Sequence, residues 1–373
     1  MVLREWARDD LAPVADVRAA LRRVAVDPSA LTDDEWVALL GADGDELEEL
    51  AALADAARRR SVSDPEALTF VVNRNMETAS VVDATSPTVE DLAREAWHLG
   101  ATEICIQGPL PVEADADGYL DLIRRIHGAA PGLHLHAFRP PEIVDAAARR
   151  GITVADFLTE ARDAGLGSVP GTAAQVLDDE VRSALSGGMA PPVDDWVEVI
   201  TTAHRSGLFS TATLLYGHVE TPVHQVRHLR RLVEIQRSTK GFSELIVMPL
   251  LPQNAPPPVA GIAGATVSRR ETRAVHAVAR LMTVGAFDHL QVAWTKVEPD
   301  TVDMLLRGGA DDLGGLLLDG LLRPDAGQEA GRELDLDEVG AIADRAGRTP
   351  RQRTTAYTAP PADRTLPLPR VRA

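Results

Sequence analysis

Eight short apolar segments, separated by helical patterns, constrain the fold of this chain more than any other feature. The first covers residues 70–72 and is followed directly by the polar residues Asn73, Arg74 and Asn75. A continuous apolar run is typical of a strand in a buried parallel sheet, and polar residues at its C-terminal end predict a site there. The other predicted strands cover residues 103–106, 133–138, 167–169, 208–216, 245–250, 290–294 and 313–318.

Strands that alternate with helices predict an α/β fold, and eight of them suit a closed (βα)8 barrel of the TIM type. A doubly wound open sheet is the alternative, but no G-x-G-x-x-G motif follows a strand. We expect an N-terminal helical extension over residues 1–68, the barrel over 69–321, and a helix with a Pro-rich tail over 322–373. One of the predicted helices covers residues 143–164 without a break.

Composition limits the partners of this chain. The net charge of −18 over 373 residues argues against nucleic acid or an anionic membrane as the main partner. No long apolar span or signal peptide is evident, so a cytoplasmic location is expected. The single cysteine, Cys105, excludes a disulfide framework within the chain. Cys105 lies between two isoleucines of a predicted strand, and we expect it to be a small core residue.

Polar residues at the ends of the predicted strands are the candidate site. His134 and His136 are two residues apart on one strand, so they share a face and could chelate a metal. No third ligand stands at a suitable spacing, and hydrogen-bonded histidines inside the barrel are the favoured interpretation. The candidate ligand-binding residues are Asn73, Arg74, Asn75, Gln107, Gly108, His134, His136, Thr172, Gln175, Tyr216, His218, Gln253 and Asn254.

A series of motifs runs along the chain from residue 69 onward. They are VVNRN at 71–75, GATEICIQG at 100–108, HLHAFRPPEI at 134–143, PGTAAQVLDDEVR at 170–182, YGHVETPVH at 216–224, PQNAP at 252–256, RGGADDLGG at 307–315 and GRTPRQRTTAY at 347–357. In these motifs the chain resembles the tyrosine-acting half of the radical S-adenosylmethionine (SAM) deazaflavin synthase (FO synthase) family. The resemblance implies a radical-SAM barrel and a role in coenzyme F-420 biosynthesis, where the family couples tyrosine to a ribityl-diaminouracil with SAM and a four-iron four-sulfur cluster.

The chain departs from the family pattern where the cofactors would bind. In the family, VVNRN precedes a C-x3-C-x2-C loop whose thiolates bind the cluster. The corresponding segment of this chain, residues 76–87, is shorter than that loop and contains no cysteine. Pro109 removes a backbone donor beside the strand end that meets the SAM amino group. Gln175 replaces an acidic residue of the family motif. We therefore expect no cofactor in this chain, although SAM binding without cleavage is compatible with the motifs.

Three hypotheses for function follow from the resemblance. The first is a homologue that has lost radical catalysis and binds a small polar molecule (an aminouracil, tyrosine or SAM) or a partner such as a complete deazaflavin synthase. The second is a barrel that performs non-radical chemistry, or radical chemistry with a cluster supplied by another chain. The third is an active transferase whose sequence lacks a segment here. The motif at 347–357 also predicts that Arg351 and Arg353 pack against the barrel.

Overall fold

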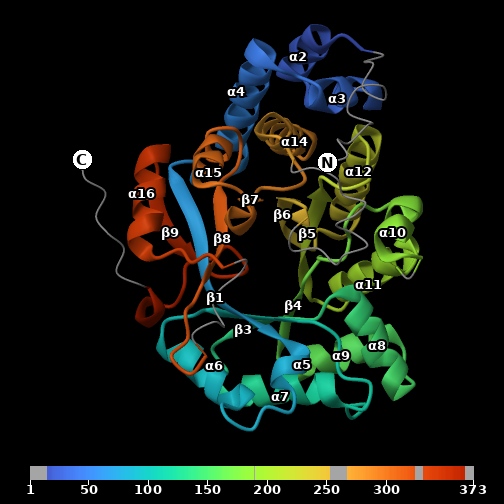
Figure 1. Cartoon of the computed structure of the whole chain (residues 1–373), viewed down its shortest axis with the longest axis vertical. Helices are drawn as coiled ribbons and strands as arrows, with labels where there is room; N and C mark the ends of the chain where they lie inside the picture. Colours follow the sequence, from blue (N-terminus) through green and yellow to red (C-terminus); the bar gives the residue numbers. More distant parts are fainter. Residues whose placement is uncertain (1–14, 189, 253–266, 324–330, 366–373) are drawn as a thin grey trace.

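The computed structural model describes residues 15–188, 190–252, 267–323 and 331–365. Its centre is a closed barrel of parallel strands surrounded by helices (Figure 1). The strands are β1 (Ala67–Glu77), β2 (Glu103–Gln107), β3 (His134–His136), β4 (Leu166–Val169), β5 (Phe209–Tyr216), β6 (Phe242–Pro249), β7 (Leu290–Val292), β8 (Asp312–Leu317) and β9 (Thr349–Arg353).

The strand order proves the closed barrel. Strands β2 to β8 pair with their sequence neighbours in order, and β1 pairs with both β8 and β2. Every described pairing is parallel. The predicted (βα)8 barrel is therefore confirmed, and the open doubly wound alternative is wrong.

Helices cover the outside of the barrel, and apolar side chains fill the space between the two layers. The α-helices of the described chain, including those of the N-terminal region, are α2 (Val17–Val26), α3 (Asp33–Leu40), α4 (Gly44–Ser61), α5 (Thr78–Val81), α6 (Val89–His98), α7 (Gly118–Ala129), α8 (Pro140–Arg150), α9 (Val154–Ala164), α10 (Asp179–Ser186), α11 (Val193–Arg205), α12 (Pro222–Thr239), α14 (Arg269–Met282), α15 (Pro299–Leu306) and α16 (Leu336–Ala346). Short 3-10 helices are η1 (Pro28–Ala30), η3 (Trp294–Lys296) and η5 (Ala362–Arg364). Among the described residues, none of the helices combines the length and apolar character needed to cross a membrane.

Strand β1 is longer than the sequence predicted. It continues through the polar residues to Glu77 and leads directly into the short helix α5. Successive side chains of a strand point to opposite faces, so Asn73 and Asn75 face the barrel interior while Arg74 faces the helices. The expectation that the strand ends at residue 72 is wrong, because the apolar run marks only its more buried half.

The predicted helix over residues 143–164 is two helices, α8 and α9. Gly151 ends α8 in the left-handed conformation, with φ of 64°. Thr153 then caps α9 by accepting a hydrogen bond from the backbone N–H of Asp156. Glycine adopts that conformation without strain, so the break is encoded by the local pair of Gly151 and Thr153.

The N-terminal helices pack against one side of the barrel. Helix α4 lies along α14, and α3 contacts α12 and α14 (Figure 1). Two arginines of these barrel helices reach across the contact. Arg270 donates to the backbone carbonyls of Leu40 and Ala42, and Arg230 pairs with Asp33.

The C-terminal region contributes a ninth strand that the sequence did not predict. Strand β9 pairs with residues 67–71 of β1, while β2 pairs with residues 73–77 further along β1. Arg353, the last residue of β9, is buried against Asp312 and Glu244, as the motif predicted. Arg351 is different, since its side chain is 59% exposed and pairs with Asp64. The segment after α16 is thus part of the barrel.

We predict that Arg353→Met lowers the free energy of unfolding by about 3 kcal/mol or more, because it leaves two buried carboxylates without their cation. The matched change Arg351→Met removes an exposed ion pair and should cost less than about 1 kcal/mol. Equilibrium denaturation of both variants measures the difference. Equal losses would show that the buried guanidinium does not hold β9 in place.

Candidate functional site

A cavity of about 1000 Å³ opens into the interior of the barrel. Its wall follows the two-residue period of the strands, because inward-facing residues line it while their neighbours face the helices. On β2, for example, Glu103, Cys105 and Gln107 line the cavity, whereas Ile104 and Ile106 are fully buried in the apolar layer. The barrel thus separates a polar interior from an apolar exterior.

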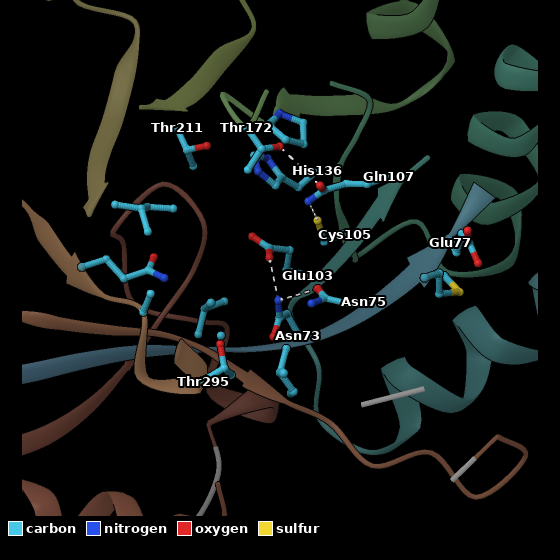
Figure 2. Close-up of a pocket in the computed structure, with 18 of the residues that line it drawn as sticks. Asn73, Asn75, Glu77, Glu103, Cys105, Gln107, His136, Thr172, Thr211 and Thr295 are labelled. Carbon is cyan, nitrogen blue, oxygen red and sulfur yellow. Dashed lines mark hydrogen bonds between the residues drawn. The ribbon is translucent and has the colours of Figure 1, made fainter. Parts of the chain in front are cut away.

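Five of the predicted site residues line this cavity: Asn73, Asn75, Gln107, His136 and Thr172. Figure 2 shows that they come from β1, β2, β3 and the loop after β4. The amide of Asn73 donates to Glu103 Oε1 at 3.2 Å and to Asn75 Oδ1 at 3.3 Å. Thr172 Oγ1 donates to Gln107 Oε1 at 3.3 Å. These hydrogen bonds form two groups in one polar wall: Asn73 with Asn75 and Glu103, and Thr172 with Gln107.

Two candidates next to this wall, Arg74 and Gly108, do not line the cavity. Arg74 is fully buried beneath α6, where it donates to the Leu92 carbonyl and pairs with Glu95, both at 2.8 Å. The backbone N–H of Gly108 donates to Glu142 Oε1 at 3.0 Å. Such contacts give Arg74 and Gly108 structural roles in joining strands to helices.

The candidates from the middle of the chain are also outside the cavity wall. Tyr216 is buried with its ring edge-on to His276. The His218 ring is fully buried, with Nε2 donating to the Leu215 carbonyl at 2.9 Å and Nδ1 lying 3.0 Å from Glu220. Gln175 is held through its backbone carbonyl, which accepts from the N–H of Leu215. Gln253 and Asn254 lie outside the described residues.

His134 and His136 share a hydroxyl group. Ser168 Oγ lies 2.7 Å from Nε2 of His134 and 2.6 Å from Nδ1 of His136. Burial lowers the pKa of His134 to about 4 and, together with the nearby Arg353, that of His136 to about 3. Both rings are therefore neutral at physiological pH. In the described parts of the chain, no three His, Cys, Asp or Glu side chains are arranged to hold a metal ion.

The floor of the cavity is a charged network. Its residues were not among the candidates, which were chosen as polar residues at the ends of the predicted strands. Glu103, Glu244 and Arg353 line the cavity, and Asp312 lies buried beside them. Arg353 binds Asp312 with two nitrogens, at 2.6 and 2.7 Å, and Glu244 at 2.9 Å. The sequence carried a signal for this network. Glu103 begins one predicted strand and Glu244 directly precedes another, and ionised groups beside buried apolar runs rarely lie without partners.

Glu244 has a perturbed proton affinity. Its Oε2 accepts hydrogen bonds from Arg353 and from the hydroxyl of Tyr357. Burial, opposed by Arg353 and reinforced by Asp312, raises the pKa of Glu244 to about 7. The Tyr357 ring stacks on His289, with centroids 3.6 Å apart, and the Cζ atom of Arg353 lies 3.9 Å from the centroid of the same tyrosine ring. A carboxyl group that titrates near neutrality thus faces the cavity.

Cys105 is buried, as expected of a small core residue, but its side chain also borders the cavity. It lines the cavity and accepts a hydrogen bond from Gln107 Nε2 at 3.1 Å (Figure 2). A four-iron four-sulfur cluster of the family type needs three thiolates on the segment after β1. Here that segment is the end of β1 and α5, and the chain has one cysteine, on β2. The residues present therefore do not fit such a cluster.

The sequence is similar to curated proteins of known activity. It is 35% identical over 320 residues to the "5-amino-6-(D-ribitylamino)uracil--L-tyrosine 4-hydroxyphenyl transferase" of Archaeoglobus fulgidus, covering 82% of this chain and 92% of that protein. It is 43% identical over 361 residues to the FO synthase of Mycobacterium leprae, covering 92% of this chain and 42% of that protein. This chain thus spans about two fifths of the FO synthase. No family model matches the sequence.

Solved structures support the fold. HydG, a maturase of the [FeFe]-hydrogenase, superposes with a TM-score of 0.69 at 16% identity, over 95% of this chain and 81% of HydG. Methylornithine synthase (PylB) gives a TM-score of 0.63 at 16% identity, over 89% of this chain and 97% of PylB. At this identity the likeness shows the fold alone, and it agrees with the barrel that the sequence resemblance implied.

We predict that Glu244→Gln changes how stability depends on pH. Because the folded-state pKa is raised from 4.5 to about 7, the contribution of Glu244 to stability is complete below pH 4.5 and is lost as pH rises through 7. Relative to wild type, the variant should therefore become more stable between pH 5 and pH 8. The exposed control Glu198→Gln should show no such trend in the same denaturation series. A pH-independent difference for Glu244→Gln would contradict the raised pKa.

Proposed function

Because the chain belongs to the family of 5-amino-6-(D-ribitylamino)uracil–L-tyrosine 4-hydroxyphenyl transferases and FO synthases, we propose that it binds a small polar molecule of that chemistry without radical cleavage of SAM. The molecule is an aminouracil, tyrosine or SAM itself. The binding site is the barrel cavity. In this proposal the chain is a ligand-binding member of a catalytic family.

The position of the one cysteine carries the proposal. Cluster binding in the family uses three thiolates, and Cys105 alone, on the wall of β2, cannot replace them. Without a cluster, SAM has neither an iron atom to chelate its amino acid group nor an electron source for cleavage. The loss therefore removes the radical step while leaving the barrel intact.

The retained polar wall supports binding. Closure of a barrel does not require inward amides, and apolar side chains fill the interiors of many TIM barrels. Here Asn73, Asn75, Gln107 and Thr172 instead surround an open space large enough for a small ligand. Polar groups in such a wall serve to orient a bound molecule.

A partner chain is the second part of the proposal. The FO synthase relatives are more than twice as long as the matched region, while the Archaeoglobus transferase matches over nearly its whole length. We infer that this chain associates with a complete FO synthase or with the other half of that activity. Co-purification of tagged chain with such a synthase, from cells that contain both, tests the association.

Non-radical catalysis is the alternative function that one observation favours. Glu244 faces the cavity with a pKa of about 7, which suits a group that accepts and returns protons near neutral pH. Turnover of an aminouracil or tyrosine without SAM, lost in Glu244→Gln, would support this alternative over simple binding.

We predict that anaerobic reconstitution with iron and sulfide leaves the protein without a cluster. The visible absorbance of a four-iron four-sulfur centre should be absent, and reduction in the presence of SAM should yield no 5′-deoxyadenosine. A cysteine-bearing relative treated in parallel is the positive control. Stoichiometric iron that disappears in Cys105→Ala would contradict the proposal and point to a cluster shared between chains.

We also predict that a cognate ligand raises the melting temperature. At a hundredfold excess over its dissociation constant, binding stabilises the native state by about 2.7 kcal/mol. Thr172→Ala, in the cavity wall, should reduce the shift, whereas Thr159→Ala, exposed on α9, should leave it unchanged. A melting temperature that does not change with millimolar aminouracil, tyrosine or SAM would contradict the binding proposal.

A further inference from the structure

The buried floor of the cavity has more negative than positive charge. Glu103, Glu244 and Asp312 are each 5% exposed or less, and they face a single guanidinium, that of Arg353. His136, the nearest imidazole in the wall, is neutral because burial lowers its pKa to about 3. Burying unpaired carboxylates costs several kcal/mol each, so this imbalance needs compensation.

Arg353 is already committed to two of the three carboxylates. Its Nε and one terminal nitrogen bind both oxygens of Asp312, and that terminal nitrogen also reaches Glu244 Oε2. The other terminal nitrogen donates to the Thr354 carbonyl at 3.3 Å. The guanidinium therefore has little capacity left for Glu103.

Glu103 is stabilised by neutral donors. Its Oε1 accepts from the Asn73 amide at 3.2 Å, and its Oε2 accepts from the Thr355 hydroxyl at 2.7 Å. No salt bridge reaches Glu103 from the residues that the structure describes. Neutral donors compensate a buried charge less than a cation does.

Acceptors also outnumber donors around Glu103. The Asn73 amide nitrogen is oriented by two acceptors, Glu103 and Asn75, which fixes the flip of the side chain. Its Oδ1 is then left buried without a hydrogen-bond donor in the described structure. A Cβ on Gly315 would lie 2.5 Å from that oxygen, so glycine is needed to admit it. The floor therefore lacks donors.

The other cations that line the cavity lie away from its floor. Arg139, Lys296 and Arg323 line it with half-buried side chains, in contrast to the buried carboxylates. Arg139 pairs with Glu142 on α8. The cavity thus becomes more negative with depth, which favours a ligand that enters with a positive group foremost.

We propose that the cavity floor binds the cationic nitrogen of its ligand, an ammonium, amidinium or protonated ring nitrogen, through Glu103 and Glu244. The inference rests on the proposed function, since it names the chemical class of the molecule that the cavity takes. The cation supplies the charge that Arg353 cannot, and its N–H groups supply donors to an acceptor-rich floor.

Cation binding at this floor is linked to protons. Glu244 faces Arg353 and Tyr357 of the C-terminal segment, Asp312 of β8 and Glu103 of β2, while His289, before β7, stacks on Tyr357 and pairs with Asp311. A bound cation favours the ionised form of Glu244. Binding near pH 6.5 should therefore release up to about one proton, and affinity should rise with pH until Glu244 is ionised.

Three phenols of matched skeleton test the charge requirement: tyramine (cationic), tyrosol (neutral) and 3-(4-hydroxyphenyl)propionate (anionic). Calorimetry on the full chain at pH 7.5 should show tyramine binding at least about tenfold more tightly than tyrosol, and the anion most weakly. Glu103→Gln and Glu244→Gln should each weaken tyramine about tenfold or more while changing tyrosol less than about twofold. Titration at pH 6.5 in phosphate and in the zwitterionic buffer ACES, which differ in their enthalpies of ionisation, measures the released proton.

Two failures can be told apart. If tyrosol binds as tightly as tyramine, or if both glutamine variants weaken the two ligands equally, the cation inference is overturned and the proposed function stands. If no phenol, aminouracil, tyrosine or SAM binds at millimolar concentration, the proposed function fails and the inference fails with it. If Glu103→Gln does not fold, Glu244→Gln alone tests the cation inference. That variant should fold, because the side-chain oxygen of Gln can still accept the hydrogen bond from Arg353.

Discussion

One buried guanidinium connects the C-terminal segment to the centre of the barrel. Arg353 bridges Asp312 on β8 and Glu244 on β6, and the residues that follow it reach Glu103 on β2 and cover Glu244 with Tyr357. The C-terminal segment is thus both a structural strand and the floor of the cavity. The stability of this region and the proposed ligand binding therefore depend on the same few charges.

Alternation along the strands explains how the family scaffold persists while its cofactor chemistry does not fit. Outward residues such as Arg74 attach the strands to helices, and inward residues such as Asn73 and Gln107 build the polar wall. Neither set depends on the segment after β1. A short α5 can therefore stand where the family carries its thiolate loop without disturbing the barrel.

The sequence was sufficient for the barrel but only partly for the site. Apolar runs locate buried strands, and their alternation with helical patterns predicts the parallel barrel. The motifs did not say which face each polar residue occupies: Asn73 and Arg74 are adjacent, yet one lines the cavity and the other is buried under α6. Glu244 and β9 were missed because their partners are distant in sequence. Arg353 and Glu244 are 109 residues apart and meet only when the barrel closes.

Native mass spectrometry of the protein, purified without oxygen from its own host, tests the central claim most directly. We expect a population at the mass of the chain plus one small organic molecule that carries a positively charged nitrogen, and we expect Glu103→Gln to lose this population. A mass increment equal to a four-iron four-sulfur cluster would contradict the account. So would a chain that carries no small molecule and acquires none from millimolar tyramine, tyrosine, aminouracil or SAM.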